Sequence, residues 1–152
     1  MEQMVEQRRI LVTGAGGPAG ITVVRTLRQH GMWVLGTDIN PYGAGLQLAD
    51  EKAIIPPYTE PGYAESLVAL ARQYGANGLI STMTEGLTVL TEPGNDRLFA
   101  EAGIATWFPP KSAVDACLDK AAFAEITESA GQPVPRSAWG AVDAALDRVP
   151  GP

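Results

Sequence analysis

The chain has 152 residues with a formal net charge of −6, and hydrophobic residues make up 45% of it. Such a length suffices for one domain with a real core, and the composition is that of a soluble globular protein. No basic stripe and no run of 18 apolar residues occur in it, which disfavours nucleic acid, anionic membrane surfaces and membrane spans.

Cysteine and histidine are scarce. The single cysteine, Cys117, has no internal disulfide partner, and only one histidine is present. The lone thiol fits a reducing compartment, and the acidic amino terminus lacks the apolar segment of a signal peptide. We therefore expect a cytoplasmic protein without a metal site, in which Cys117 is a small buried residue rather than a nucleophile.

Short apolar runs alternate with amphipathic stretches along the first two thirds of the chain. Strands are expected over residues 10–13, 33–37, 52–55, 78–81 and 104–107, and helices over 18–30, 63–74 and from about 87 through 102 with a break at Pro93-Gly94. This β–α–β alternation, at intervals of roughly thirty residues, predicts an α/β fold. We expect a Rossmann-like parallel sheet of about five strands with helices on both faces.

Residues 111–152 have weak strand signals and strong helical ones. Ser112 is expected to cap a short helix, and Asp119 a second one that ends at Ser129 with Phe123 and Ile126 facing inward. A last helix is expected over residues 141–148. We therefore expect a domain over residues 1–110 and a helical linker over 111–152, whose loop-like end we interpret as a cut before a further domain.

The loop after the first expected strand, TGAGGPAG, is rich in glycine. It fits both G-x-G-x-x-G/A and G-x-x-G-x-x-G spacing, through glycines that include Gly14, Gly16, Gly17 and Gly20. Such glycines let a backbone approach a phosphate, and the following helix offers unpaired N–H groups. Asp38 ends the second strand, where a ribose-binding acid belongs. One hypothesis is therefore a dinucleotide site made by Gly14, Gly17, Gly20 and Asp38.

A structural interpretation explains the same residues. A tight strand-to-helix turn needs glycine for its backbone angles, and Asp38 before Asn40-Pro41 also suits an ordinary turn. A short-chain reductase should carry a Tyr-x-x-x-Lys pair, yet none of the four tyrosines has a lysine four positions on. The pattern of the whole chain therefore disfavours a reductase while leaving both interpretations of the loop open.

Four stretches together form a pattern typical of one enzyme family. They are ILVTGAGGPAG, GTDINPYGAGLQLADEKAIIPP, YAESLVALARQYGANGLISTMTEG and CLDKAAFAEITESAGQPVP. The last is the most specific, with Asp119-Lys120, then Phe123, then Gly-x-Pro-x-Pro from Gly131 to Pro135. From residue 10 to about residue 136 the chain resembles the N-terminal, pre-ATP-grasp part of ATP-grasp enzymes, and most of all carbamoyl-phosphate-synthase-like large chains.

This resemblance implies a function for a longer parent protein. The parent would phosphorylate a carboxylate with ATP and Mg²⁺, and a nitrogen nucleophile would attack the acyl phosphate to form a C–N bond. Lys120 matches a family position that reaches the ATP phosphates. Gly14, Gly16, Gly17 and Glu85 match positions on the substrate side of the cleft. Without the ATP-grasp lobes, we expect this chain to be inactive, to supply no catalytic residue and to bind ATP weakly or not at all.

Two other functions are weighed against the ligase. One is the NAD(P)-binding domain of a reductase or epimerase, and the other is a stand-alone binding module of the same fold. The partners expected for the ligase are the missing ATP-grasp domain and small carboxylate and amine substrates. A homodimer through an apolar face that normally packs on the missing lobes would be an artefact.

Overall fold

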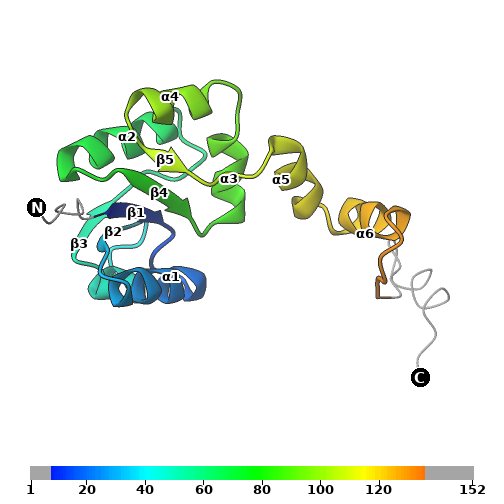
Figure 1. Cartoon of the computed structure of the whole chain (residues 1–152), viewed down its shortest axis with the longest axis horizontal. Coiled ribbons are helices and arrows are strands. Elements are labelled where there is room, and N and C mark those ends of the chain that lie inside the picture. Colours follow the sequence, from blue (N-terminus) through cyan, green and yellow to red (C-terminus); the bar gives the residue numbers. More distant parts are fainter. Residues whose placement is uncertain (1–7, 136–152) are drawn as a thin grey trace, which may run out of the picture. The chain divides into compact units, whose positions relative to one another are not determined.

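The computed structural model describes residues 8–135, which divide into two compact units split after Lys111 (Figure 1). The first unit holds β1 (Arg9–Thr13), α1 (Pro18–Gln29), β2 (Trp33–Asp38), the short 3-10 helix η1 (Ala44–Leu48), β3 (Glu51–Ile54), α2 (Tyr63–Tyr74), β4 (Gly78–Ser81), α3 (Thr84–Leu90), α4 (Asn95–Glu101) and β5 (Ala105–Thr106). No helix within residues 8–135 is long and apolar enough to cross a membrane.

The five strands form one parallel sheet in the order β3-β2-β1-β4-β5. β1 lies at the centre, where Ile10 is in register with Val34 of β2 and with Gly78 of β4. This order confirms the predicted Rossmann-like sheet. It also makes β1 and β4 neighbours although they are not consecutive strands, so the chain changes direction across the sheet between them.

The two faces of the sheet have separate cores. On one face, Val12 and Val34 pack with Val24 of α1 and Leu46 of η1. On the other face, Leu11, Leu35 and Leu79 pack with residues of α2, α3 and α4, among them Leu67, Leu90 and Phe99. Helices therefore cover both faces, as expected, with α1 on one side and α2 and α4 on the other (Figure 1).

Several element boundaries differ from the sequence-based expectation, most of all in β3, α3 and β5. β3 begins and ends one residue earlier than expected, and α3 begins at Thr84 rather than near residue 87. β5 spans only Ala105–Thr106, which pair with Gly78 and Leu79. The strand is short because Pro109 and Pro110 follow closely and have no N–H to donate to a ladder, and Trp107 is left 73% exposed.

Two helices, α5 (Lys111–Leu118) and α6 (Lys120–Ser129), follow β5. Asp119 caps α6 as expected, because its Oδ1 accepts hydrogen bonds from the N–H groups of Ala121 at 2.9 Å and Ala122 at 3.1 Å. The expected cap at Ser112 is wrong, since α5 already begins at Lys111 and places Ser112 inside the helix. The helix expected over residues 141–148 lies outside the described residues.

The expected inward face of α6 is a further correction. Phe123 is 48% exposed and Ile126 is 55% exposed, and no residue of α6 is buried in the described structure. Cys117, expected to be buried, is exposed as well. Helical spacing identifies which side of a helix is apolar, but it does not supply the surface that would cover that side.

Candidate functional site

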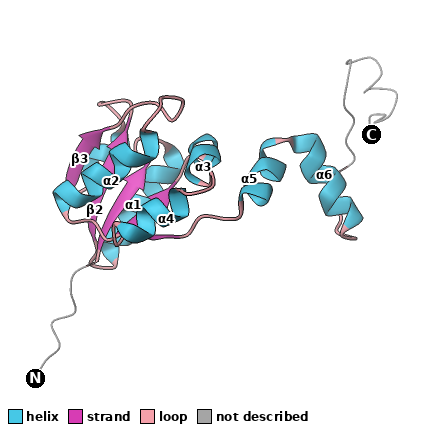
Figure 2. Cartoon of the chain, turned by 90° about the horizontal axis from the view of Figure 1, so that it is seen from above, coloured by secondary structure: helices cyan, strands magenta, loops and turns pink. Residues whose placement is uncertain are grey.

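The candidate site lies where the loops after β1 and β4 leave adjacent strands. α1 and α3 contribute to the cores on opposite faces of the sheet, and Figure 2 shows both helices from above, together with the sheet. Open α/β sheets bind ligands at such a point. Thr82 joins the two loops, because its N–H donates to the Thr13 carbonyl at 3.2 Å and its Oγ1 to the same oxygen at 2.8 Å. Its Oγ1 also reaches the Gly14 carbonyl at 3.1 Å.

The backbone amides of the glycine loop are engaged within the protein. Ala15 N–H donates to the Thr37 carbonyl at 3.0 Å, and Gly17 N–H to the Gly14 carbonyl at 3.2 Å. Gly16 N–H donates to Oδ2 of Asp38 at 2.8 Å. A phosphate in this loop would have to break these bonds before it could accept from the same three amides.

Asp38 uses both carboxylate oxygens to hold backbone. Oδ2 accepts from Gly16, and Oδ1 accepts from the N–H of Asn40 at 2.9 Å. In a dinucleotide-binding domain an acid at this position binds ribose hydroxyls. Here the carboxylate ties the glycine loop to the turn after β2, which favours the structural interpretation of both.

The segment after β2 packs directly on the glycine loop. A Cβ placed on Gly43 would lie 2.6 Å from the Gly16 Cα, and one on Gly45 would overlap the carbonyl oxygen of Ala15. These two glycines determine the shape of the loop and were not predicted as site residues. The signal available in the sequence was a Gly-x-Gly pair within the expected turn, since close backbone approach requires glycine.

The predicted site residues fall into two groups. Gly14, Gly16 and Gly17 lie together with Asp38 after β1 and β2, and Gly20 lies buried in α1 against the loop. Glu85 is exposed in the first turn of α3, at the same edge of the sheet. Lys120 is exposed at the start of α6 and belongs to the second unit. The first unit therefore builds the carboxyl edge of its sheet from the glycines, Asp38 and Glu85.

Residues 10–106 match the family described as "PylC-like, N-terminal domain". The chain belongs to this PylC-like N-terminal domain family. The match covers the sheet from the second residue of β1 to the end of β5, so the candidate site of the first unit falls inside it.

Solved structures share the fold of this PylC-like domain. N5-carboxyaminoimidazole ribonucleotide synthetase from Thermotoga maritima has a TM-score of 0.62 at 19% identity, over 93% of this chain and 36% of that one. The enzyme of the same name from Thermus thermophilus has a TM-score of 0.60 and 18% sequence identity, and the alignment covers 92% of this chain and 36% of that one. The biotin carboxylase domain of a single-chain bacterial carboxylase has a TM-score of 0.55 and 16% sequence identity, and the alignment covers 90% of this chain and 32% of that one. The chain thus spans about a third of each.

Two hydroxyls of the PylC-like domain were not predicted as site residues. Thr13 ends β1 and Tyr63 begins α2, and both hydroxyls are buried without a hydrogen-bond partner in the described structure. Burial raises the pKa of Tyr63 above its usual value of 10.0, while the neighbouring Thr13 hydroxyl lowers this pKa and the Asp38 carboxylate raises it. No sequence pattern indicates an unsatisfied hydroxyl, because it depends on which elements pack together.

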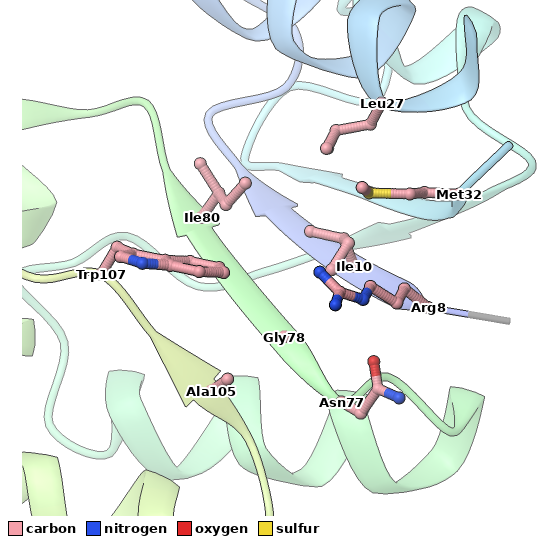
Figure 3. A pocket seen from close by; sticks show the side chains of 9 residues that line it. All are labelled: Arg8, Ile10, Leu27, Met32, Asn77, Gly78, Ile80, Ala105 and Trp107. Carbon is pink, nitrogen blue, oxygen red and sulfur yellow. The ribbon is translucent and has the colours of Figure 1, made fainter. Parts of the chain in front are cut away.

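An apolar groove of about 510 Å³ lies on the face of the sheet that carries α1 (Figure 3). Ile80 of β4 and Trp107 line it on one side, and Leu27 of α1 lies across from them. The groove runs along the strands, from Arg8 and Asn77, which precede β1 and β4, to Ile80 near the end of β4 and Trp107 after β5. None of the loop glycines, Asp38 or Glu85 lines it, so the groove is distinct from the candidate site.

Metal-binding side chains are not clustered in this part of the chain. Among residues 8–135, no group of three or more His, Cys, Asp or Glu side chains is arranged to hold a metal ion. Mg²⁺ with a nucleotide needs carboxylate and phosphate oxygens around it.

Proposed function

We propose that this chain is the N-terminal, pre-ATP-grasp domain of an ATP-dependent carboxylate–amine ligase. The proposal is supported by the PylC-like family match over residues 10–106 and by a fold shared with N5-carboxyaminoimidazole ribonucleotide synthetases and a biotin carboxylase domain. Residues 1–110 are the domain, and 111–152 link it to the ATP-grasp domain of the full-length protein. The motif from Asp119 to Pro135 favours a carbamoyl-phosphate-synthase-like member.

The reaction proposed for the full-length protein has two steps. A substrate carboxylate oxygen attacks the γ-phosphorus of ATP, which breaks the bond to ADP and gives an acyl phosphate. The amine then attacks the acyl carbon, phosphate leaves and the nitrogen loses a proton, so that a C–N bond has formed. ATP and Mg²⁺ are the cofactors, and the cytoplasm is the proposed location. The described residues have no catalytic role in this scheme.

The hydrogen bond from Gly16 N–H to Asp38 is the observation that favours a ligase domain over an NAD(P)-binding one. A dinucleotide-binding loop keeps its amides and its acid free for phosphate and ribose. In this chain the Gly16 amide donates a hydrogen bond of 2.8 Å to the Asp38 carboxylate. We propose that the glycine loop shapes the substrate side of the cleft and does not hold a cofactor.

Lys120 is the proposed nucleotide residue. Its backbone starts α6 directly after the cap Asp119, and the residue is exposed. An ammonium group held at the start of an ordered helix would offset the charge of a triphosphate bound by the neighbouring ATP-grasp domain. By itself the exposed lysine would bind ATP weakly.

The test uses the full-length protein. ADP release is measured with a panel of carboxylates and amines, and Lys120→Ala is compared with Lys52→Ala. Lys52 is a matched control because it is an exposed lysine of β3 whose Nζ contacts only Gln47 Oε1, at 3.2 Å, in the described structure. We expect ADP release that depends on both substrates and falls at least about tenfold in Lys120→Ala alone.

A separate titration of this chain with NADH tests the dinucleotide alternative. Micromolar binding of NADH that is lost in Asp38→Ala would overturn the proposal. We expect no such binding, because the three loop amides and both Asp38 oxygens already have partners. A full-length protein that folds but releases no ADP with any of the substrates would also contradict the proposed ligase function.

A further inference from the structure

Two unsatisfied hydroxyls mark a buried polar spot at the carboxyl end of β1. Thr13 is 0% exposed and Tyr63 is 1% exposed. Neither Thr13 Oγ1 nor Tyr63 Oη has a hydrogen-bond partner in the described structure. Buried polar groups in folded proteins nearly always have partners, and an exception calls for a physical reason.

The two hydroxyls belong to the point where β1 and β4 part. They are neighbours: the Thr13 side chain acts on the Tyr63 phenol as a hydrogen-bonding group and so lowers its pKa, although the geometry between the two hydroxyls does not complete a hydrogen bond. A Cβ placed on Gly86 of α3 would lie 3.6 Å from Tyr63 Oη. The pair therefore lies between the end of β1 and the start of α3, at the edge of the sheet where α/β ligands bind.

Met83 fills the space between the two loops. A Cβ on Gly14 would lie 2.6 Å from Met83 Cγ, and one on Gly86 would lie 3.8 Å from Met83 Cε. The Met83 side chain thus extends from the glycine loop to α3, and glycine at both positions leaves room for it. Methionine is unbranched and flexible, so this side chain can move away without a change in the backbone.

We propose that Thr13 and Tyr63 form the floor of a subsite for an amino group, and that Met83 covers this subsite when no ligand is bound. The inference rests on the proposed ligase function and assigns the site to its amine substrate. Two hydroxyl oxygens have the lone pairs to accept hydrogen bonds from an amino group, which carries several donors.

The charges near the floor favour an amine over a carboxylate. The charge that acts on the pKa of Tyr63 is the carboxylate of Asp38, and Glu85 lies in the first turn of α3. A negative ligand at this place would meet charges of its own sign, whereas an ammonium group would be attracted by both. The subsite therefore favours a cationic ligand and is distinct from a phosphate-binding site.

The experiment follows the methyl signal of Met83 in this chain labelled at its methionine methyl groups. n-Butylamine is the probe, and butyrate and 1-butanol are matched ligands with the same chain length. We expect n-butylamine to shift the Met83 signal, with butyrate and 1-butanol causing much smaller shifts. Tyr63→Phe should weaken amine binding about fivefold, which corresponds to one net hydrogen bond.

Two further variants make the result specific. Tyr74→Phe removes a hydroxyl at the opposite end of α2 and should leave amine binding unchanged. Thr13→Val removes the second floor hydroxyl and replaces Tyr63→Phe as the test if that variant does not fold. Met83→Ala should bind n-butylamine more tightly than the parent chain, because nothing then has to be displaced.

Two outcomes overturn the inference. One is a Met83 shift by butyrate as large as the shift by n-butylamine, and the other is amine affinity unchanged in both Tyr63→Phe and Thr13→Val. Ligase activity of the full-length protein is measured separately. If the full-length protein is active but this chain does not bind the amine, the subsite is rejected and the ligase function stands. If this chain binds the amine but the full-length protein has no ligase activity, the ligase function is rejected and the subsite can no longer be assigned to an amine substrate of that reaction.

Discussion

The carboxylate of Asp38 accepts a hydrogen bond of 2.8 Å from the backbone amide of Gly16. The two residues are 22 positions apart, and each belongs to a pattern that is typical of a dinucleotide site. Their contact gives both residues a structural role. The carboxylate that would bind a ribose and the amide that would bind a phosphate in a dinucleotide site are here bonded to each other.

Loss of the Asp38 carboxylate should destabilise the domain. Asp38→Ala leaves the half-buried Gly16 amide and the Asn40 amide without their acceptor. Hydrogen bonds to charged groups contribute about 1.5–3 kcal/mol, so we expect a loss in this range in urea unfolding. Glu60→Ala, which changes an exposed acid at the same edge, is the control and should lose less than about 0.5 kcal/mol. An unchanged midpoint in Asp38→Ala would refute the structural role.

Gly45 and Gly17 provide a matched pair of glycines. Gly45→Ala puts a Cβ onto the carbonyl oxygen of Ala15, where backbone has to move, and should cost more than about 2 kcal/mol. Gly17→Ala puts a Cβ at 3.7 Å from the Gly14 oxygen, an ordinary contact, and should cost at most about 1 kcal/mol. Thermal unfolding of the two variants checks this order. Equal losses would mean that the turn after β2 does not pack on the loop.

Local patterns predicted most of the sheet but not the closure of the loop. The bounds of α2 and β4, and the cap at Asp119, match the structure because periodicity and capping depend on neighbours in sequence. The contact of Asp38 with Gly16 and the packing of Gly43 on the loop join distant residues. A local Gly-x-Gly pair can indicate that backbone comes close at Gly43, but it does not indicate which distant segment lies there. The exposure of Phe123 in α6 likewise depends on which surface covers the helix, and a local pattern does not supply that surface.

Removal of the Tyr63 hydroxyl should not cost stability in the ligand-free chain. A buried hydroxyl without a partner carries a desolvation penalty of about 1–3 kcal/mol, and Tyr63 Oη has no partner in the described structure. Tyr63→Phe is therefore expected to be equal to the parent or up to about 1 kcal/mol more stable in urea unfolding. A loss of that size instead would show that the hydroxyl makes a hydrogen bond in solution, which would also remove the proposed subsite.

The raised pKa of Tyr63 predicts a loss of stability in alkali. Burial raises this pKa above the usual value of 10.0, so the folded chain holds the phenol proton more tightly than the unfolded chain does. The stabilisation is fully present below the unfolded pKa and is lost as the pH rises through the folded pKa. As the pH rises above about 10, the unfolding free energy should therefore fall more steeply in the parent chain than in Tyr63→Phe. Parallel curves for the two chains would contradict the shift.

The cap at Asp119 should decide whether α6 forms in this chain. α6 has 10 residues and none of them is buried in the described structure, so it lacks the packing that stabilises most short helices. Asp119→Ala removes the acceptor for the amides of Ala121 and Ala122 and should cost about 1 kcal/mol of helix stability. Backbone chemical shifts over 120–129 should then move toward unfolded values, while Asp119→Asn, which keeps a side-chain oxygen, should retain the helix. Unchanged shifts in Asp119→Ala would show that contacts other than the cap hold α6.

Because Lys120 is the first residue of this helix, the Asp119→Ala change should also weaken ATP use by the full-length protein, in proportion to the helix that is lost.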